Sequence, residues 1–217
     1  MKTLIIVAHP QIENSTTQQF FKEGLAGFID FTWHPIANEY QIDEEQELLQ
    51  QADRIIFQFP LYWYSAPALL KQWIDDVFSV NQLDLTNKEL GLVVSTGSPA
   101  KDFQAGGLEQ FTMSEVLRPF EMLANKMKLH YLTPITVFQF AYLNKLEQQH
   151  LLIQYQQYVT LTNFDSFDSK IAWFNEILKQ KSTDNSELEQ IITVLEDNED
   201  ARHDLLMDVN QFKQDED

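Results

Sequence analysis

Short apolar runs alternate with amphipathic segments over the first 160 residues of the chain. Four runs are apolar at both odd and even positions and rich in β-branched or aromatic residues: 4–8 (LIIVA), 55–59 (IIFQF), 90–94 (LGLVV) and 135–138 (ITVF). Such runs are typical of strands covered on both faces, as in a parallel sheet. A weaker run at 31–33 predicts a fifth strand at an edge.

Amphipathic stripes between these runs predict helices. Pro67 precedes the second stripe, at a place where the first turn of a helix accepts proline. Thr112 and Glu115 have the spacing of a capping box before the third stripe, while Pro119 predicts a kink or a late helix start there. The four predicted helical segments are 20–28, 69–78, 116–127 and 146–159.

The alternation of strands and helices with short connections implies a parallel sheet with helices on both faces. Five strands suit a flavodoxin-like, doubly wound α/β fold with the strand order 2-1-3-4-5. Sheets of this kind bind ligands beyond the carboxyl ends of the strands, at the topological switch point. The loops after residues 8, 59 and 94 are therefore where we expect the functional site.

The character of the chain changes after about residue 163. We predict one more helix over 164–181, a break at 182–185, and then two short acidic amphipathic helices. Twelve acidic and two basic residues lie between Asp184 and Asp217. We therefore expect an α/β domain of residues 1–165 and an acidic helical C-terminal extension of residues 166–217, whose simplest interpretation is a solvated appendage.

Composition narrows the class of protein further. Hydrophobic residues make up 44% of the chain, enough for a sizeable core, and the formal net charge of −18 disfavours nucleic acid and anionic membranes as partners. The chain has no cysteine, and its five histidines lack the spacing of paired metal ligands, so we predict no metal site. Without a signal-peptide pattern or a long apolar run, we expect a cytoplasmic protein with no membrane insertion.

The first candidate loop, residues 9–18, joins a strand to a helix and contains no glycine, so no P-loop or G-x-G-x-x-G motif is available. Ser15, Thr16 and Thr17 place three hydroxyls at a helix N-terminus, where free amides and the helix dipole favour a phosphate. The spacing equally allows Ser15 to be only an N-cap and His9 to be only a packing residue.

The second loop carries three consecutive aromatic residues, Tyr62, Trp63 and Tyr64. Because neighbouring side chains in a loop point in different directions, these three are hard to bury in one core, and a flat ligand could stack on them. A dimer contact or a local aromatic plug would explain the same residues. In the third loop, Gly97 would let the backbone approach a ring closely.

At these residues the sequence resembles a known family. Residues 58–75 (QFPLYWYSAPALLKQWID) are similar to the signature of NAD(P)H:quinone oxidoreductases of the DT-diaphorase type. They are equally similar to the soluble ancillary subunits of glutathione-gated potassium-efflux systems. The segments 8–10 (AHP), 95–97 (STG), 106–107 (GG) and 117–120 (LRPF) also match, and the resemblance spans about residues 1–160.

The resemblance implies a flavin cofactor, NADPH or NADH as reductant, a small-molecule electron acceptor, and a homodimer. The short first loop favours FMN, with FAD as the alternative. The implied flavin contacts fall into three groups: His9, Ser15, Thr16, Thr17 and Gln18 at the phosphate and ribityl chain; Pro60, Leu61, Tyr62, Trp63 and Tyr64 along the ring; and Ser95, Thr96, Gly97 and Ser98 at its other rim.

The sequence departs from the family pattern in the stretch that the resemblance places near the reactive face of the flavin. Phe103 stands where tyrosine is common, that stretch has no histidine, and Ser98 replaces a glycine. We therefore assign no catalytic acid or base to the protein.

These observations predict an NAD(P)H-dependent oxidoreductase that transfers a hydride through bound FMN to a quinone or a similar acceptor. One alternative is a flavin-binding regulatory subunit of a potassium-efflux transporter, which co-purification with a transporter would favour. Another is a flavodoxin-like one-electron carrier, which a stable blue semiquinone on titration would favour. The aromatic loop and Gly106-Gly107 favour the two-electron enzyme.

Overall fold

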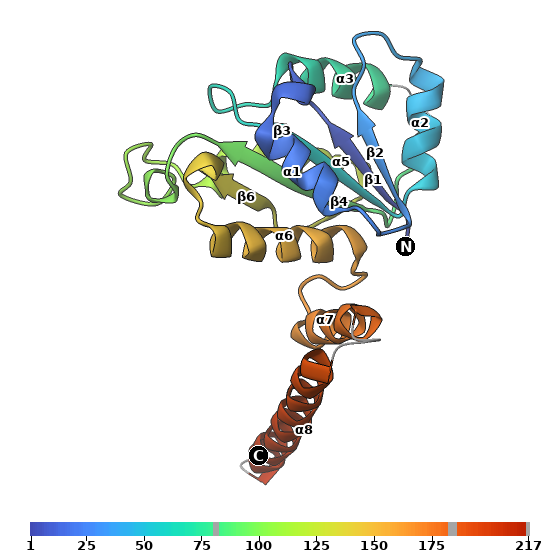
Figure 1. The fold of residues 1–217 in the computed structure, drawn as a ribbon. Helices are drawn as coiled ribbons and strands as arrows, with labels where there is room; N and C mark the ends of the chain where they lie inside the picture. The colour runs from blue at the N-terminus through green and yellow to red at the C-terminus, as the bar shows by residue number, and fades with distance from the viewer. Residues whose placement is uncertain (80–82, 182–185, 216–217) are drawn as a thin grey trace. The chain divides into compact units, whose positions relative to one another are not determined.

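The computed structural model describes residues 1–79, 83–181 and 186–215 (Figure 1). The chain divides into two compact units, Met1–Thr160 and Leu161–Asp217. The first unit is a sheet with helices on both faces, and the second is built from two helices.

The first unit contains a parallel sheet with the order β2-β1-β3-β4-β5, which confirms the predicted flavodoxin-like fold. A sixth segment, β6, pairs with the end of β4, while β5 pairs with its start, so the two share the fifth position. Pro134, which has no amide hydrogen for the ladder, lies between them. The strands are β1 (Thr3–Val7), β2 (Phe31–Pro35), β3 (Arg54–Pro60), β4 (Glu89–Thr96), β5 (His130–Tyr131) and β6 (Ile135–Phe138).

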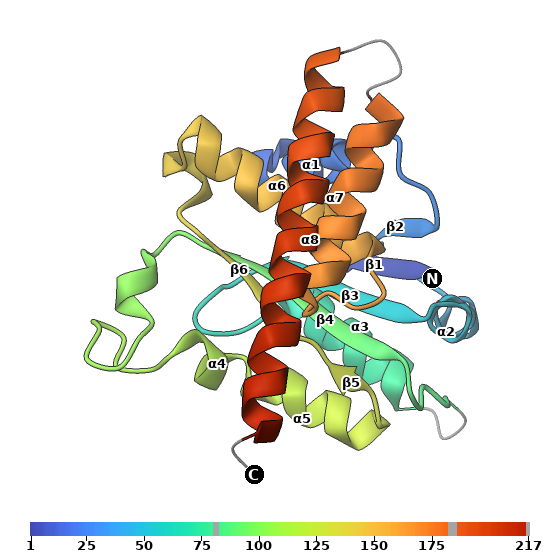
Figure 2. The ribbon, with the colours of Figure 1, turned by 90° about the horizontal axis from the view of Figure 1, so that it is seen from below.

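Helices cover both faces of this sheet, and Figure 2 shows α1 and α6 on the side opposite α3 and α5. The first layer contains α1 (Thr16–Gly24) and α6 (Lys145–Thr160). The second contains α2 (Ile42–Gln51), α3 (Ala68–Phe78), α4 (Met113–Val116) and α5 (Arg118–Met127). In the described connections lie the short 3-10 helices η1 (Ile12–Asn14), η2 (Ala100–Asp102) and η3 (Phe140–Tyr142).

The core explains why the strand sequences are apolar at both parities. Ile6, Phe57 and Leu92 face a cluster that also contains Trp73 and Phe120 from α3 and α5. Their neighbours along the strands face α1 and α6 and are just as buried. Each fully buried side chain of this size contributes about 1.5–3 kcal/mol, so both faces of the sheet favour the same arrangement.

The four predicted helices of the first unit are confirmed, with local differences. Pro67 is the residue that precedes α3, not part of its first turn. The capping box of Thr112 and Glu115 is confirmed and begins the short helix α4, and α5 begins at Arg118 with Pro119 in its first turn. Helix α2 was not predicted, because only three of its ten residues are apolar and they give a weak stripe.

The second unit contains α7 (Phe167–Lys181) and α8 (Ser186–Asp215), which pack against each other. The predicted helix over 164–181 is confirmed as α7. The prediction of two short helices after it is wrong: α8 is one helix of 30 residues, since no proline or glycine interrupts it. The predicted break at 182–185 lies outside the described residues. No helix in the described parts of the chain is long and apolar enough to cross a membrane.

Gly91 in β4 makes a close contact that can be tested. A Cβ at this position would lie 2.6 Å from the hydroxyl oxygen of Tyr158. We therefore expect Gly91→Ala to lower the free energy of unfolding by about 1–3 kcal/mol in urea titrations, as overpacked cores do. Gly97→Ala is the matched control, because a Cβ there would meet no atom within 4 Å. Equal destabilisation of the two variants would contradict this packing.

Candidate functional site

The three candidate loops leave the sheet at the same edge. Strands β1, β3 and β4 are neighbours in parallel register, so their carboxyl ends lie side by side. The amide of Ala8 donates to the carbonyl of Gln58 at 2.9 Å, and the amide of Leu61 donates to the carbonyl of Ser95 at 2.8 Å. Backbone hydrogen bonds therefore connect the starts of the first and second loops to the next strand.

The first loop ends in a capped helix. Ser15 is the N-cap of α1, and its Oγ accepts from the amide of Gln18 at 3.3 Å. Because the cap uses this oxygen as an acceptor, the hydroxyl hydrogen of Ser15 is still available to a ligand. The helix itself provides no acceptor for the amides of Thr16 and Thr17, so this terminus offers an anion several donors.

His9 lies at the start of the same loop. Its Nδ1 accepts from the amide of Gln11 at 3.0 Å, which places the ring hydrogen of neutral His9 on Nε2. Partial burial lowers the pKa of His9 below its usual value. The side chain is therefore neutral near pH 7 and can donate one hydrogen bond from Nε2.

The second loop is a tight two-residue turn built from large aromatic residues. Tyr62 and Ser65 exchange two backbone hydrogen bonds, at 2.9 and 3.0 Å. The two residues between them, Trp63 and Tyr64, both have positive φ angles, 47° and 62°. This is the geometry of a type I′ turn, in which Asn and Gly are favoured and bulky side chains are strained. Strain of this kind tends to occur at functional sites.

The three aromatic side chains of this turn are exposed rather than packed together. Trp63 is 92% exposed, Tyr64 is 53% exposed and Tyr62 is 43% exposed. A local aromatic plug within this chain would bury them, so that alternative does not describe the structure. The hydroxyl of Tyr64 donates to Glu109 at 2.8 Å, which raises its pKa and fixes the direction of one ring.

The third loop follows β4. Beside Gly97 the backbone adjoins open space, since a Cβ there would meet no atom within 4 Å. The amide of Ser98 donates to the hydroxyl oxygen of Thr96 at 3.3 Å. Phe103 is buried, and its ring packs at 6.2 Å from that of Phe138, so it serves as a core residue here.

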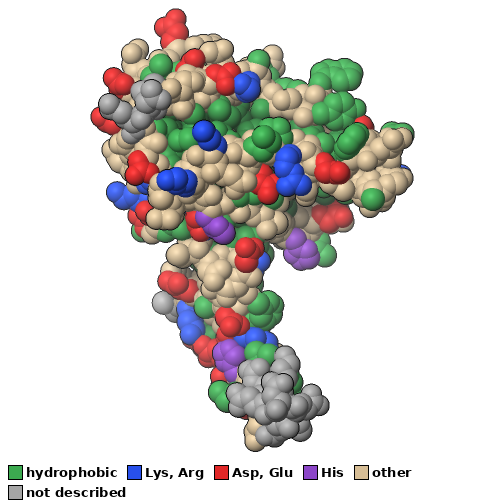
Figure 3. Space-filling model, turned by 180° about the vertical axis from the view of Figure 1, so that it is seen from behind, with side chains coloured by type: hydrophobic (Ala, Val, Ile, Leu, Met, Phe, Trp, Pro, Cys, Tyr) green, Lys and Arg blue, Asp and Glu red, His purple; other side chains and the backbone are tan. Residues whose placement is uncertain are grey.

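A cleft of about 410 Å³ lies beside the aromatic turn, lined by Tyr64, Glu109, Phe111, Glu115 and Val116. No sequence pattern predicted Glu109, because its contact with Tyr64 joins two loops. Figure 3 shows hydrophobic side chains gathered on the face of the first unit that is hidden in Figure 1.

One residue of the predicted set differs from the rest. Gln18 is buried, and its Oε1 accepts from Nε2 of Gln58. Gln58 in turn accepts from the hydroxyl of Tyr155. Sequence reasoning missed Gln58 and Tyr155, although Gln58 stands out as an uncharged polar residue in the middle of an apolar strand. The other predicted residues are at least partly exposed: His9, Ser15, Thr16, Thr17, Pro60, Leu61, Tyr62, Trp63, Tyr64, Ser95, Thr96, Gly97 and Ser98.

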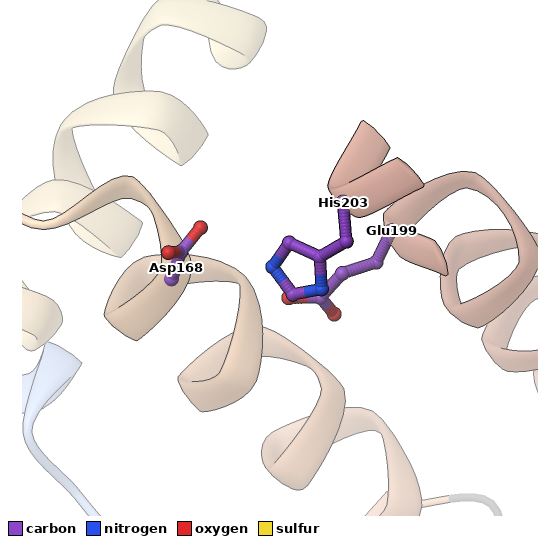
Figure 4. Close-up of side chains that lie close together, drawn as sticks. All are labelled: Asp168, Glu199 and His203. Carbon is purple, nitrogen blue, oxygen red and sulfur yellow. The ribbon is translucent and has the colours of Figure 1, made fainter. Parts of the chain in front are cut away.

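The second unit holds a separate cluster of metal-ligand types, Asp168 from α7 with Glu199 and His203 from α8 (Figure 4). Their ligand atoms lie within 4.8 Å of one another. The guanidinium of Arg202 pairs with Asp168 and lies 3.1 Å from Nε2 of His203. Arginine is always charged and can only donate, so Arg202 neutralises Asp168 and donates to the lone pair of the His203 Nε2. A metal ion would need both of these groups. We therefore assign no metal to this cluster.

Comparison with known proteins places the first unit in a family. The model of the flavodoxin-like fold family matches residues 1–159. The NAD(P)H oxidoreductase YrkL of Bacillus subtilis, itself uncharacterised, is 41% identical over 156 residues, or 67% of this chain and 90% of that protein. The potassium-efflux ancillary protein KefG of Cronobacter sakazakii is 34% identical over 148 residues, or 63% of this chain and 80% of that protein.

Two solved structures are similar over the same region. The crystal structure of an NADPH-quinone reductase from P. pentosaceus has 54% identity and a TM-score of 0.73, and the match covers 75% of this chain and 100% of that chain. General stress protein 14 of Treponema denticola, in complex with FMN, has 32% identity and a TM-score of 0.66, over 73% of this chain and 98% of that chain.

The chain therefore belongs to the flavodoxin-like family of NAD(P)H:quinone oxidoreductases, which also includes the KefG-type ancillary proteins. By this homology it is an oxidoreductase of the NAD(P)H:quinone type, and the resemblance seen in the sequence is confirmed. The family match ends at residue 159, so α7 and α8 lie beyond it.

Proposed function

We propose that the chain binds FMN at the carboxyl edge of its sheet and transfers a hydride from NADPH or NADH to a quinone or a similar small acceptor. The observation that carries this proposal is the convergence of three loops at one edge. A helix N-terminus with free donors, a strained and exposed aromatic turn, and an open backbone at Gly97 all leave neighbouring strands there.

The first loop fits the phosphate of the cofactor. The amides of Thr16 and Thr17, the hydroxyl of Ser15 and the Nε2–H of His9 are donors suited to an anion at the start of α1. The loop is short, and the similar general stress protein 14 was solved with FMN, which supports FMN rather than FAD.

The second and third loops fit the flavin ring. We propose that Pro60, Leu61 and the aromatic turn line one rim, and that residues 95–98 line the other. When bound, the flavin supplies the redox chemistry, accepting a hydride from the nicotinamide and passing it on. The protein holds the ring by backbone groups at the turn and excludes water with apolar side chains. Phe103 is buried and has no titratable proton, so we assign no acid or base there.

We make two proposals about partners. The KefG proteins are ancillary to a potassium-efflux system, so a regulatory role beside a transporter is a second candidate function. We also propose a homodimer, because large apolar side chains such as Phe111 and Met122 are exposed in the single chain. Co-purification with a transporter would support the regulatory role. Light scattering measures the mass in solution, which should be that of two chains.

The test of the proposed function uses the purified full-length protein. We expect a yellow protein that releases FMN on denaturation, identified by its mass, and that oxidises NADPH or NADH when menadione is added. The rate should depend on both the reductant and menadione. A colourless protein that added FMN cannot reconstitute, or a reconstituted protein with no turnover of either nucleotide, would overturn the proposal.

A further inference from the structure

Three buried polar side chains form a hydrogen-bonded chain between α6 and α1. The hydroxyl of Tyr155 in α6 donates to Oε1 of Gln58 in β3 at 2.8 Å, and Nε2 of Gln58 donates to Oε1 of Gln18 in α1 at 2.5 Å. All three residues are at most 1% exposed. The backbone N–H of Gln18 donates to Oγ of Ser15, which links the chain through Gln18 to the N-cap of α1.

The surroundings of this chain are apolar. Gln58 is flanked in the sheet by the buried Val7 of β1 and Val93 of β4. The ring of Tyr155 packs against Phe21 with 4.3 Å between ring centroids. Apolar side chains of similar volume would fill this space without needing partners, whereas a buried amide needs its hydrogen bonds satisfied. Because hydrogen bonds depend on angle as well as distance, the polar side chains fix the orientation of α1 on the sheet more narrowly than apolar packing does.

The hydrogen bond from Tyr155 to Gln58 also persists near neutral pH. Burial raises the pKa of Tyr155 well above its usual value, so the hydroxyl keeps the hydrogen that it donates to Gln58. A further hydrogen bond ties α1 to the loop that precedes it: Nε2 of Gln19 donates to the carbonyl of Ile12 at 3.0 Å. Hydrogen bonds of Gln18 to β3 and of Gln19 to the preceding loop thus hold the first turn of α1.

We propose that Tyr155, Gln58 and Gln18 are positioning residues for the phosphate of the cofactor. They act through Ser15 and the first turn of α1, where they hold the amides of Thr16 and Thr17 in the orientation that a phosphate requires. This inference rests on the proposed function. It makes Tyr155 of α6, which lies in none of the three loops, a determinant of FMN affinity. It also gives Gln18, predicted from the sequence as a flavin contact, the role of supporting the first loop from within the core.

The test compares two cofactors that differ only in the phosphate. Full-length apoprotein is titrated with FMN and with riboflavin, and quenching of flavin fluorescence gives the two dissociation constants. We expect Tyr155→Phe to weaken FMN binding about five- to tenfold, the effect of one buried hydrogen bond, and to leave riboflavin binding within about twofold. A merely structural role would weaken both ligands together.

Tyr158→Phe is the matched control. Tyr158 lies one turn further along α6 and is equally buried, but its hydroxyl accepts from the amide of Leu92 in β4. We expect this variant to leave the ratio of the two dissociation constants unchanged, even if urea titration shows lower stability. Gln58→Leu removes both links of the chain and should change the ratio at least as much as Tyr155→Phe.

The possible results separate the inference from the function that it rests on. An unchanged FMN-to-riboflavin ratio in Tyr155→Phe and Gln58→Leu, with flavin bound normally, overturns the positioning role alone. A parent protein that binds neither flavin overturns the proposed function, and the positioning role with it. A change of equal size in Tyr158→Phe would also overturn the inference, because it would show that any loss of packing at α6 has this effect.

Discussion

Replacement of the aromatic pair by Trp63→Asn together with Tyr64→Gly is expected to stabilise the protein and to impair its function. Both positions have positive φ, where Asn and Gly are favoured and where a bulky residue costs about 1 kcal/mol or more. The free energy of unfolding in urea should therefore rise by about 1–2 kcal/mol.

The same double variant should bind FMN at least about tenfold more weakly, because two exposed aromatic groups that can pack on a flat ring are lost. Lys128→Gly is the control, since Lys128 also has positive φ but ends α5, away from the three loops. It should gain stability without a change in FMN affinity. If the double variant binds FMN as tightly as the parent, the strained turn does not serve the flavin.

A negative charge at the start of α1 should have an equally large effect. Thr17→Glu places a carboxylate next to the proposed phosphate, and two such anions at about 4–6 Å repel each other by a few kcal/mol in a partly desolvated site. We expect FMN to bind about 100-fold more weakly, measured by calorimetry with the apoprotein. Riboflavin, which has no phosphate, should bind as before.

Although Thr17→Glu should weaken FMN binding, it should raise the free energy of unfolding. An acidic side chain in the first turn of a helix is favourable by about 0.3–1 kcal/mol, so weak FMN binding would not reflect unfolding. Leu146→Glu is the control, because it adds the same charge to the exposed first turn of α6. Equal loss of FMN affinity in both variants would indicate a general charge effect and would contradict a phosphate site at Thr17.

The fold could be predicted because its strands have an unambiguous pattern. The runs at 4–8 and 55–59 are apolar at odd and even positions, which is typical of a sheet covered on both faces. Helix α2 could not be predicted, because burial of Glu45 against Trp73 and His34 depends on partners distant in the sequence. The tail was divided wrongly because its two apolar stripes looked separate, whereas helix continuity depends on the absence of a breaker between them.

The convergence of the three candidate loops was predictable from the sequence. The three loops follow buried strands, and parallel pairing brings their beginnings together whatever their composition. The type I′ turn was not predictable, because Trp63 and Tyr64 are poor residues for positive φ and tertiary structure overrides that preference. The role of Gln58 also depends on the approach of α6 to β3, which no local pattern encodes.

The most direct test of the account is the set of backbone amide shifts on addition of flavin to isotopically labelled apoprotein. With FMN, the account predicts shifts in all three loops together: at Thr16 and Thr17, at Tyr62 to Tyr64, and at Thr96 and Gly97. With riboflavin, the shifts at Thr16 and Thr17 should be much smaller while those of the other two loops remain. FMN-dependent shifts that leave these loops unchanged would contradict the account.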